Sequence, residues 1–150
     1  MITIAMSTVV HTPPGRVWRA IAEPAEVIRW DEHVVSLETP ASGYPESGES
    51  AHWRYRLGSV PVDLVDTPVE VVPGQRLKHA MAIGAFAFEE VYTLAGEGSL
   101  RTRLSLRLAS SSNSVPVVGG QLDRFDVRRL ASEIVDRNLR AIQKWCENHP

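Results

Sequence analysis

The last part of the chain carries one long amphipathic pattern, and this pattern limits the fold more than any other feature of the sequence. Apolar residues recur there at three- and four-residue steps, at Ala131, Val135, Leu139, Ile142 and Cys146. This spacing predicts an α-helix over roughly residues 122–147 with one apolar stripe along its whole length. A helix of about 25 residues is nearly 40 Å long. Only a sheet built from the preceding residues is large enough to cover such a stripe.

The preceding residues supply that sheet, because they alternate between apolar and polar positions as half-buried strands do. The clearest example is residues 100–108, where leucines and a threonine alternate with arginines and a serine. Strands are predicted over Ile2–Val10, Val34–Leu37, Ala51–Val60, Val60–Val72, Leu77–Ile83, Phe86–Leu94 and Leu100–Leu108. Pro-, Gly- and Ser-rich stretches predict turns between several of them, and residues 110–121 read as a flexible joint before the long helix.

Two short helices are predicted between the first two strands. Pro13 and Pro14 end the first strand, since proline donates no hydrogen bond and suits the first turn of a helix. Val17 and Ile21 then follow at helical spacing. Pro24 ends this helix or begins a second one that runs to Trp30.

The order of these elements and four short segments resemble a known family. The segments are residues 12–21 (TPPGRVWRAI), 28–30 (IRW), 71–77 (VVPGQRL) and 139–147 (LRAIQKWCE). They resemble the START/Bet v 1-like (SRPBCC) helix-grip superfamily, especially its bacterial polyketide cyclase/dehydrase-like members. The resemblance covers residues 1–150 as one domain. It implies an α+β fold in which a curved antiparallel sheet of about six to seven strands wraps a long C-terminal helix.

The resemblance also implies a cavity between sheet and helix for hydrophobic ligands such as lipids, polyketides or isoprenoids. Small-molecule cavities are lined mainly by apolar and aromatic side chains with a few polar groups. Position within the strands predicts ligand contact by Trp53, Tyr55, Met81, Phe86, Phe88, Tyr92 and Leu104. Trp30 joins this set, although packing is the favoured role for it. Asn138 interrupts the apolar side of the long helix and is either a polar anchor in the cavity or a cap or solvent contact.

Two polar residues share the inward positions and are the candidates for acid–base catalysis. His79 alternates with Leu77 and Met81, and Glu90 lies between two aromatic residues of the same parity. A carboxyl group buried among apolar side chains has a raised pKa and can exchange protons near neutral pH. The alternative for His79 is a hydrogen-bonded core residue. For Glu90 it is a β-bulge with Glu89 that turns both acids to solvent.

The remaining polar residues are predicted to have structural or solvent roles. Asp31 and Glu32 are expected to cap a turn or contact solvent, so the segment 30–33 reads as a joint rather than a catalytic cluster. Asp63 and Asp66 are expected to be exposed. The arginines opposite the apolar strand faces are expected to form a solvated outer surface; they are Arg54, Arg56, Arg101, Arg103 and Arg107.

Composition excludes several classes of function. The net charge of −2 and the lack of a basic run argue against a nucleic-acid partner. Cys146 is the only cysteine, and the five histidines have no metal-ligand spacing, so neither a metal nor another cofactor is predicted. No apolar run reaches about 18 residues and the start lacks the features of a signal peptide, which predicts a cytoplasmic protein without stable membrane insertion. A homodimer through exposed strand edges is left open.

The sequence therefore predicts a domain that holds a polyketide- or lipid-like small molecule. One hypothesis adds acid–base cyclase or dehydratase activity through Glu90 and His79, with Tyr55 and Tyr92 orienting a carbonyl group. The alternatives are a carrier or sensor without turnover, and a protein-interaction module with a vestigial cavity.

Overall fold

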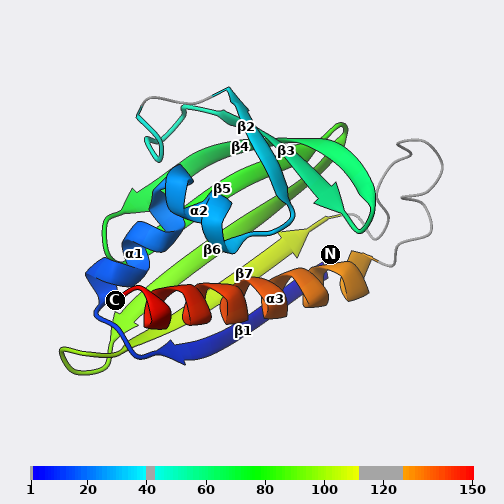
Figure 1. Cartoon of the computed structure of the whole chain (residues 1–150). Coiled ribbons are helices and arrows are strands. Elements are labelled where there is room, and N and C mark those ends of the chain that lie inside the picture. The colour runs from blue at the N-terminus through cyan, green and yellow to red at the C-terminus, as the bar shows by residue number, and fades with distance from the viewer. Residues whose placement is uncertain (1, 40–42, 112–126) are drawn as a thin grey trace.

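The computed structural model describes residues 2–39, 43–111 and 127–150. The elements in chain order are β1 (Ile2–Val10), α1 (Pro14–Ala22), α2 (Pro24–Trp30), β2 (Val34–Thr39), β3 (Ala51–Leu57), β4 (Val60–Val72), β5 (Arg76–Ile83), β6 (Phe86–Gly96), β7 (Thr102–Ser110) and α3 (Val127–Asn148). All seven strands form one sheet in the order β1-β7-β6-β5-β4-β3-β2, and every neighbouring pair is antiparallel. Figure 1 shows the sheet curving around α3, which confirms the predicted helix-grip α+β fold.

Element boundaries agree with the sequence pattern to within a few residues. The predicted bounds of β1 and β4 are confirmed, but β7 begins at Thr102 rather than Leu100. Leu100 is 71% exposed, in the turn after Gly98, whose positive φ of 75° suits glycine. The described part of α3 begins at Val127, so residues 122–126 of the predicted helix lie outside the described residues, as does most of the joint over 110–121.

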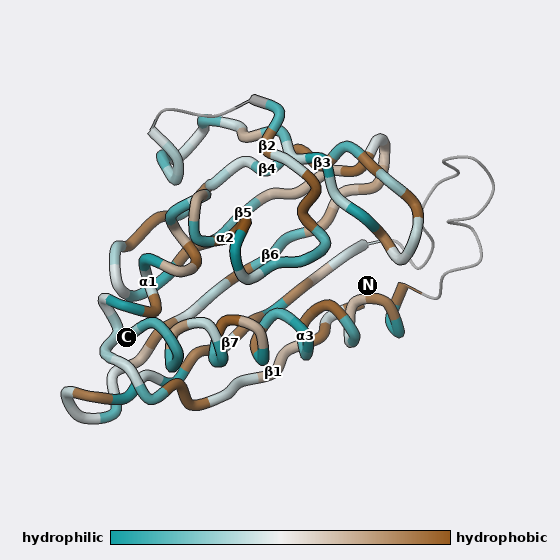
Figure 2. Tube along the Cα trace, viewed as in Figure 1, coloured by the Kyte–Doolittle hydropathy of each residue, from teal (hydrophilic) through white to brown (hydrophobic). Residues whose placement is uncertain are grey.

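The apolar stripe of α3 is the centre of the larger core. Its five predicted members are all buried, and they pack with side chains from β1, β6, β7 and α1. Among the described elements, α3 contacts β1 most extensively, followed by β7 and α1. Figure 2 shows hydrophobic and hydrophilic segments alternating along the helix. The helix therefore packs most closely on the β1–β7 side of the inner sheet face, while Val127, Leu130 and Ile134 reach the residues of the β3–β5 side.

Polar contacts fix the two short helices against α3. The carboxylate of Glu26 in α2 lies 2.7 Å from the Arg16 guanidinium of α1 and accepts a 2.8 Å hydrogen bond from the Trp145 indole of α3. The indole of Trp30 donates a 2.8 Å hydrogen bond to the carbonyl oxygen of Ala20. These contacts hold the end of α2 beside α3.

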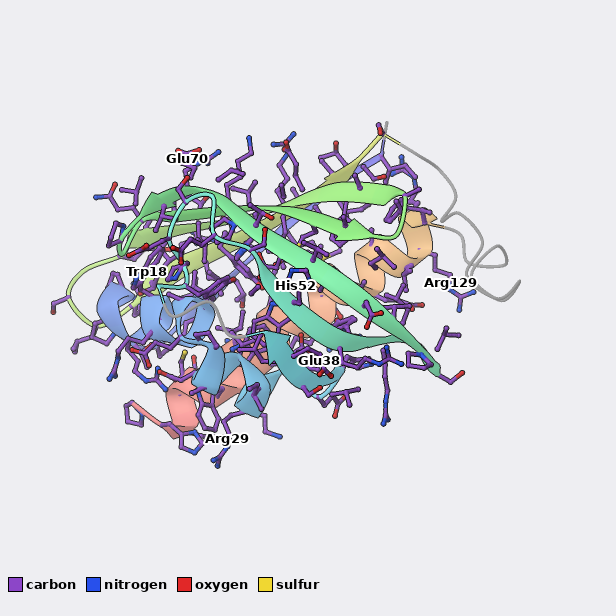
Figure 3. All side chains as sticks on the ribbon, turned by 90° about the horizontal axis from the view of Figure 1, so that it is seen from above. Trp18, Arg29, Glu38, His52, Glu70 and Arg129 are labelled. Atoms are coloured by element: carbon purple, nitrogen blue, oxygen red, sulfur yellow. The ribbon has the colours of Figure 1, made fainter. Side chains whose placement is uncertain are left out.

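Charged side chains cover the outside of the protein. Arg101, Arg103 and Arg107 are exposed, as predicted for the outer face of β7. Figure 3 shows Arg29, Glu70 and Arg129 projecting outward from the ribbon. None of the helices in the described part of the chain has the length and apolar character needed to cross a membrane.

The stripe of α3 gives a test of the fold. Ile142 is fully buried, so Ile142→Ala should lower the free energy of unfolding by about 2–5 kcal/mol, because it removes apolar contacts and leaves a cavity. Lys144→Ala is the control, since Lys144 is exposed on the same helix, and it should change stability by less than about 0.5 kcal/mol. Urea unfolding measures both. Equal midpoints for the two variants would contradict the described packing.

Candidate functional site

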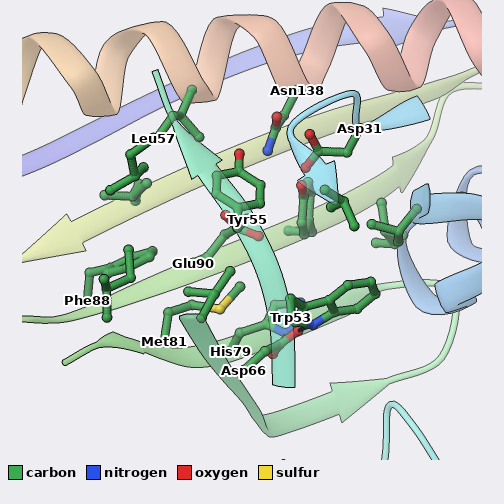
Figure 4. Close-up of a pocket in the computed structure, with 18 of the residues that line it drawn as sticks. Asp31, Trp53, Tyr55, Leu57, Asp66, His79, Met81, Phe88, Glu90 and Asn138 are labelled. Carbon is green, nitrogen blue, oxygen red and sulfur yellow. Dashed lines mark hydrogen bonds and ion pairs between the residues drawn. The ribbon is translucent and has the colours of Figure 1, made fainter. Parts of the chain in front are cut away.

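A cavity of about 80 Å³ lies between the inner face of the sheet, the end of α2 and the middle of α3. This is several times the room that one water molecule needs. Figure 4 shows Asn138 from α3 and His79 and Glu90 from the sheet around this hollow. Most lining residues are apolar or aromatic; the full set is Ile21, Val27, Trp30, Asp31, Val34, Tyr44, Trp53, Tyr55, Leu57, Leu64, Asp66, His79, Met81, Ile83, Phe88, Glu90, Tyr92, Leu108, Ile134 and Asn138.

A smaller hollow of about 30 Å³ adjoins the first one towards the start of α3. All of its lining residues are apolar: Leu57, Ile83, Phe86, Phe88, Leu108, Val127, Leu130, Ala131 and Ile134. Several of them, including Phe88 and Ile134, line both hollows. The two hollows are therefore neighbours, and these shared residues form the wall between them.

Most of the residues predicted from the sequence line the main cavity. Both catalytic candidates do so, together with Trp30, Trp53, Tyr55, Met81, Phe88, Tyr92 and Asn138. Phe86 lines only the apolar hollow. The prediction for Leu104 is wrong, because this residue is fully buried in the core under α1 and α3 and lines neither hollow. Strand parity predicts which face a side chain occupies, but not how far along the sheet the helices cover that face.

Glu90 faces the cavity from β6. Its strand has a continuous register, with Glu90 opposite His79 on β5 and Leu108 on β7, so the alternative of a β-bulge at this point is wrong. The residue is 8% exposed, and its carboxylate makes no hydrogen bond with another described residue. Burial raises the pKa of Glu90 to about 7, against an opposing effect of the neighbouring His79. A carboxyl group with this pKa can both accept and donate a proton near neutral pH.

His79 is held by a buried carboxylate. Its Nδ1 atom lies 2.6 Å from Oδ1 of Asp66. Two further donors hold the other oxygen of Asp66, namely the Tyr44 hydroxyl at 2.7 Å and the Trp53 indole at 3.2 Å. Burial by itself lowers the pKa of His79, but the charge and the hydrogen bond of Asp66 outweigh it, and the pKa is raised. The imidazole is thus held in one orientation and favours its protonated form.

The sequence analysis missed Asp66 and Tyr44. The expectation that Asp66 is exposed is wrong, because it is 3% exposed, whereas Asp63 on the same strand contacts solvent and Arg54. Parity could have found it, since Asp66 shares the inward positions of β4 with Val62 and Leu64. Tyr44 lies between β2 and β3, and no sequence pattern places it over the cavity.

The segment 30–33 is a joint that also forms part of the cavity wall. Oδ1 of Asp31 accepts a 3.0 Å hydrogen bond from the backbone of His33, which confirms the predicted turn cap. Asp31 is nevertheless buried and lines the cavity, and burial raises the pKa of its carboxyl group. Nearby, the guanidinium of Arg137 donates a 2.6 Å hydrogen bond to the Tyr55 hydroxyl.

Asn138 brings an amide from α3 into the cavity. It is 5% exposed, so the alternatives of a helix cap or a solvent contact are wrong. Its amide lies close enough to the Tyr92 hydroxyl to oppose the rise in the pKa of that group, which burial causes, while Oδ1 is buried without a hydrogen-bond partner among the described residues. Over the described ranges of the chain, no group of three or more His, Cys, Asp or Glu side chains could hold a metal ion.

Comparison with protein families identifies the class to which this structure belongs. Residues 1–147 match the family described as polyketide cyclase / dehydrase and lipid transport, so the chain belongs to this family. No curated protein sequence matches the chain.

Solved structures with the same fold cover nearly the whole chain. A START superfamily protein from Mycobacterium smegmatis is 12% identical, with a TM-score of 0.78 and 99% of both chains covered. A protein from Thermus thermophilus is 22% identical, with a TM-score of 0.76 and 99% of both chains covered. The Zhui aromatase/cyclase from Streptomyces sp. R1128 is 12% identical, with a TM-score of 0.76, and the match covers 98% of this chain and 94% of that one. At these identities the similarity shows the fold alone.

The buried pair of Asp66 and His79 predicts a change that can be measured without a ligand. In Asp66→Asn the charge that raises the pKa of His79 is lost while burial remains, so the pKa of His79 should fall. An NMR titration of the histidine ring signals measures this pKa. The control is Asp63→Asn, on the same strand but exposed, which should leave His79 unchanged. An unchanged His79 pKa in Asp66→Asn would contradict the described pairing.

Proposed function

We propose that this protein binds an aromatic or other hydrophobic carbonyl compound in the cavity and transfers a proton at the carbon next to the carbonyl group. Enolisation of this kind is the step that cyclisation and dehydration of polyketones require. The observation that carries the proposal is Glu90, a buried carboxyl group with no hydrogen-bond partner in the described residues and a pKa of about 7. Groups with strongly shifted pKa values in a cavity are characteristic of active sites.

Glu90 is the general base of the proposed reaction. Its carboxylate takes a proton from the C–H bond next to the carbonyl, and the electron pair of that bond forms the enolate. The resulting carboxylic acid can return the proton to carbon. In a dehydration it gives the proton to the departing hydroxyl group, which leaves as water. Fixing the substrate next to this group contributes much of the rate, because it removes the need for a chance encounter.

His79 stabilises the enolate in this proposal. Its Nδ1 atom is engaged by Asp66 and Tyr44, and its Nε2 atom has no hydrogen bond to another described residue. The protonated ring can therefore donate its Nε2–H to the oxygen on which negative charge develops. Because the register places His79 opposite Glu90, one bound carbonyl compound can lie within reach of both groups. Asp66 has a positioning role, since it orients the ring and favours the protonated form.

The comparisons support the reaction class without defining the substrate. The family description includes cyclases and dehydrases, and one structural neighbour is an aromatase/cyclase. The same description includes lipid transport, and the apolar hollow beside the main cavity favours a carrier without turnover as the second candidate. Both candidates use the same cavity, so only a measurement of proton transfer separates them.

Substitution of Glu90 separates the two candidates. A suitable probe is 2-tetralone, a bicyclic aromatic ketone whose protons next to the carbonyl exchange with deuterium in heavy water, which NMR follows directly. The wild-type protein should accelerate this exchange, and Glu90→Gln should reduce the catalysed rate by about 10²–10⁴-fold, because the amide is not a base. Binding of the ketone should change little. The carrier candidate predicts no acceleration by either protein.

The adjacent Glu89 provides a matched control. It is exposed on the same strand and forms an ion pair with Lys78 at 3.7 Å, so Glu89→Gln should keep the wild-type exchange rate. Equal loss of exchange in both variants would point to altered folding or surface charge, and would contradict the role of Glu90.

The pH dependence of exchange gives an independent test. Only the ionised form of Glu90 accepts a proton, and its pKa is about 7. The catalysed rate should therefore be low near pH 5 and rise with a midpoint near pH 7. NMR measurement over this range, with the rate of Glu90→Gln subtracted, should show the rise. A catalysed rate that is constant from pH 5 to 8 would contradict the assignment.

A further inference from the structure

The charged groups that line the main cavity are mostly acidic. Three carboxyl groups line it, those of Asp31, Asp66 and Glu90, and His79 is the one basic residue among the described lining residues. The charge of His79 is offset by Asp66, with which it is paired, so Asp31 and Glu90 are an excess of acidic groups in the lining. The guanidinium of Arg137 lies outside this lining and donates to Tyr55; its charge opposes the rise in the pKa of Asp31 and Glu90, but burial outweighs it in both. The cavity is therefore unfavourable for a second anion.

Two groups in the cavity are hydrogen-bond acceptors without a donor. The side chain of Asn138 lines the cavity, and its Oδ1 atom is buried without a hydrogen-bond partner among the described residues. The Glu90 carboxylate also has no hydrogen bond within the described residues. A buried acceptor without a donor costs about 1–3 kcal/mol, so a ligand that brings a donor gains by satisfying it.

The apolar hollow defines the other end of the site. Its lining includes Phe86, Val127 and Leu130, which do not line the main cavity, and it contains no polar side chain. Leu57, Ile83 and Phe88 are among the residues that line both hollows. A ligand with one polar end and one apolar end therefore fits in only one direction.

We infer that the cavity selects ligands whose head is a neutral hydrogen-bond donor, such as a phenol or an alcohol, and discriminates against carboxylates such as fatty acids. The head lies between Asn138 and Glu90, and the apolar body extends towards Phe86 and Val127. This inference rests on the proposed binding function and adds the chemical class of the ligand and its orientation.

The discrimination follows from desolvation. A carboxylate loses its hydration on entering an apolar cavity, and it regains little there, because the one cation of the described lining, His79, is already paired with Asp66 and the carboxylates of Glu90 and Asp31 repel a further negative charge. A phenol of the same shape loses much less and supplies the donor that Asn138 lacks. The same comparison predicts that a hydrocarbon binds through its apolar surface alone and is insensitive to Asn138.

Three matched probes test this inference: 2-naphthol, 2-naphthoate and naphthalene, with binding measured by calorimetry at pH 8, where most of Glu90 is ionised. We expect 2-naphthol to bind at least about tenfold more tightly than 2-naphthoate. Asn138→Leu, which keeps the branched shape and the number of side-chain heavy atoms, should weaken 2-naphthol about five- to tenfold through the lost hydrogen bond and leave naphthalene unchanged.

Unchanged naphthalene binding also shows that the variant keeps its cavity. Equal or tighter binding of 2-naphthoate to the wild-type protein overturns the inference, and this comparison needs no variant. Unchanged binding of 2-naphthol by Asn138→Leu also overturns it. If none of the three probes binds, the proposed binding function fails together with the inference. If the probes bind with the carboxylate preferred, only the inference fails.

Discussion

The packing of α3 against one side of a curved sheet is the contact on which the rest of the structure depends. The stripe of the helix is covered mainly by β1 and β7, and the two short helices are fastened to its C-terminal half through Glu26. The strands from β6 to β2, on the other side of β7 from β1, belong to the part of the sheet that curves away from this contact (Figure 1). Side chains from one helix and one curved sheet do not fill the space between them, and the unfilled part is the cavity.

The chemistry of the cavity follows from placing a few ionisable groups in that apolar space. Burial raises the pKa of Glu90, because the carboxylate loses its hydration and no described residue donates a hydrogen bond to it. Burial by itself lowers the pKa of His79, but the charge and the hydrogen bond of Asp66 outweigh this effect and raise the pKa. The two neighbouring residues are thus suited to different roles, Glu90 as a base and His79 as a proton donor. Such a pair is a common arrangement in acid–base enzymes. The reaction proposed here needs only this difference and a bound carbonyl compound.

The same groups limit what can bind. Family members share the fold, but the polar residues within the hollow determine which ligand heads are favourable. Our inference that neutral donors are preferred rests on the acceptors of Asn138 and Glu90 and on the excess of acids in the lining. The inferred orientation of the ligand rests on the apolar hollow near Val127. In this view the class of ligand is a property of a few side chains and can differ widely among proteins with nearly identical backbones.

The sequence by itself determined the fold, because periodicity reports which face of each strand and helix is apolar, and the order of these elements with four short segments resembles a known family. The five-residue stripe of α3, the bounds of β4 and the inward position of His79 followed from spacing, whereas spacing left a β-bulge open at Glu90 that only the strand register excludes. Tertiary structure decided which inward residues border empty space. Leu104 occupies an inward position of its strand, but it packs in the core with residues of α1 and α3. Tyr44 lies outside any periodic segment of the sequence, and its hydroxyl still donates a hydrogen bond to Asp66. Periodicity describes one element at a time, and a cavity exists only between elements that are distant in sequence.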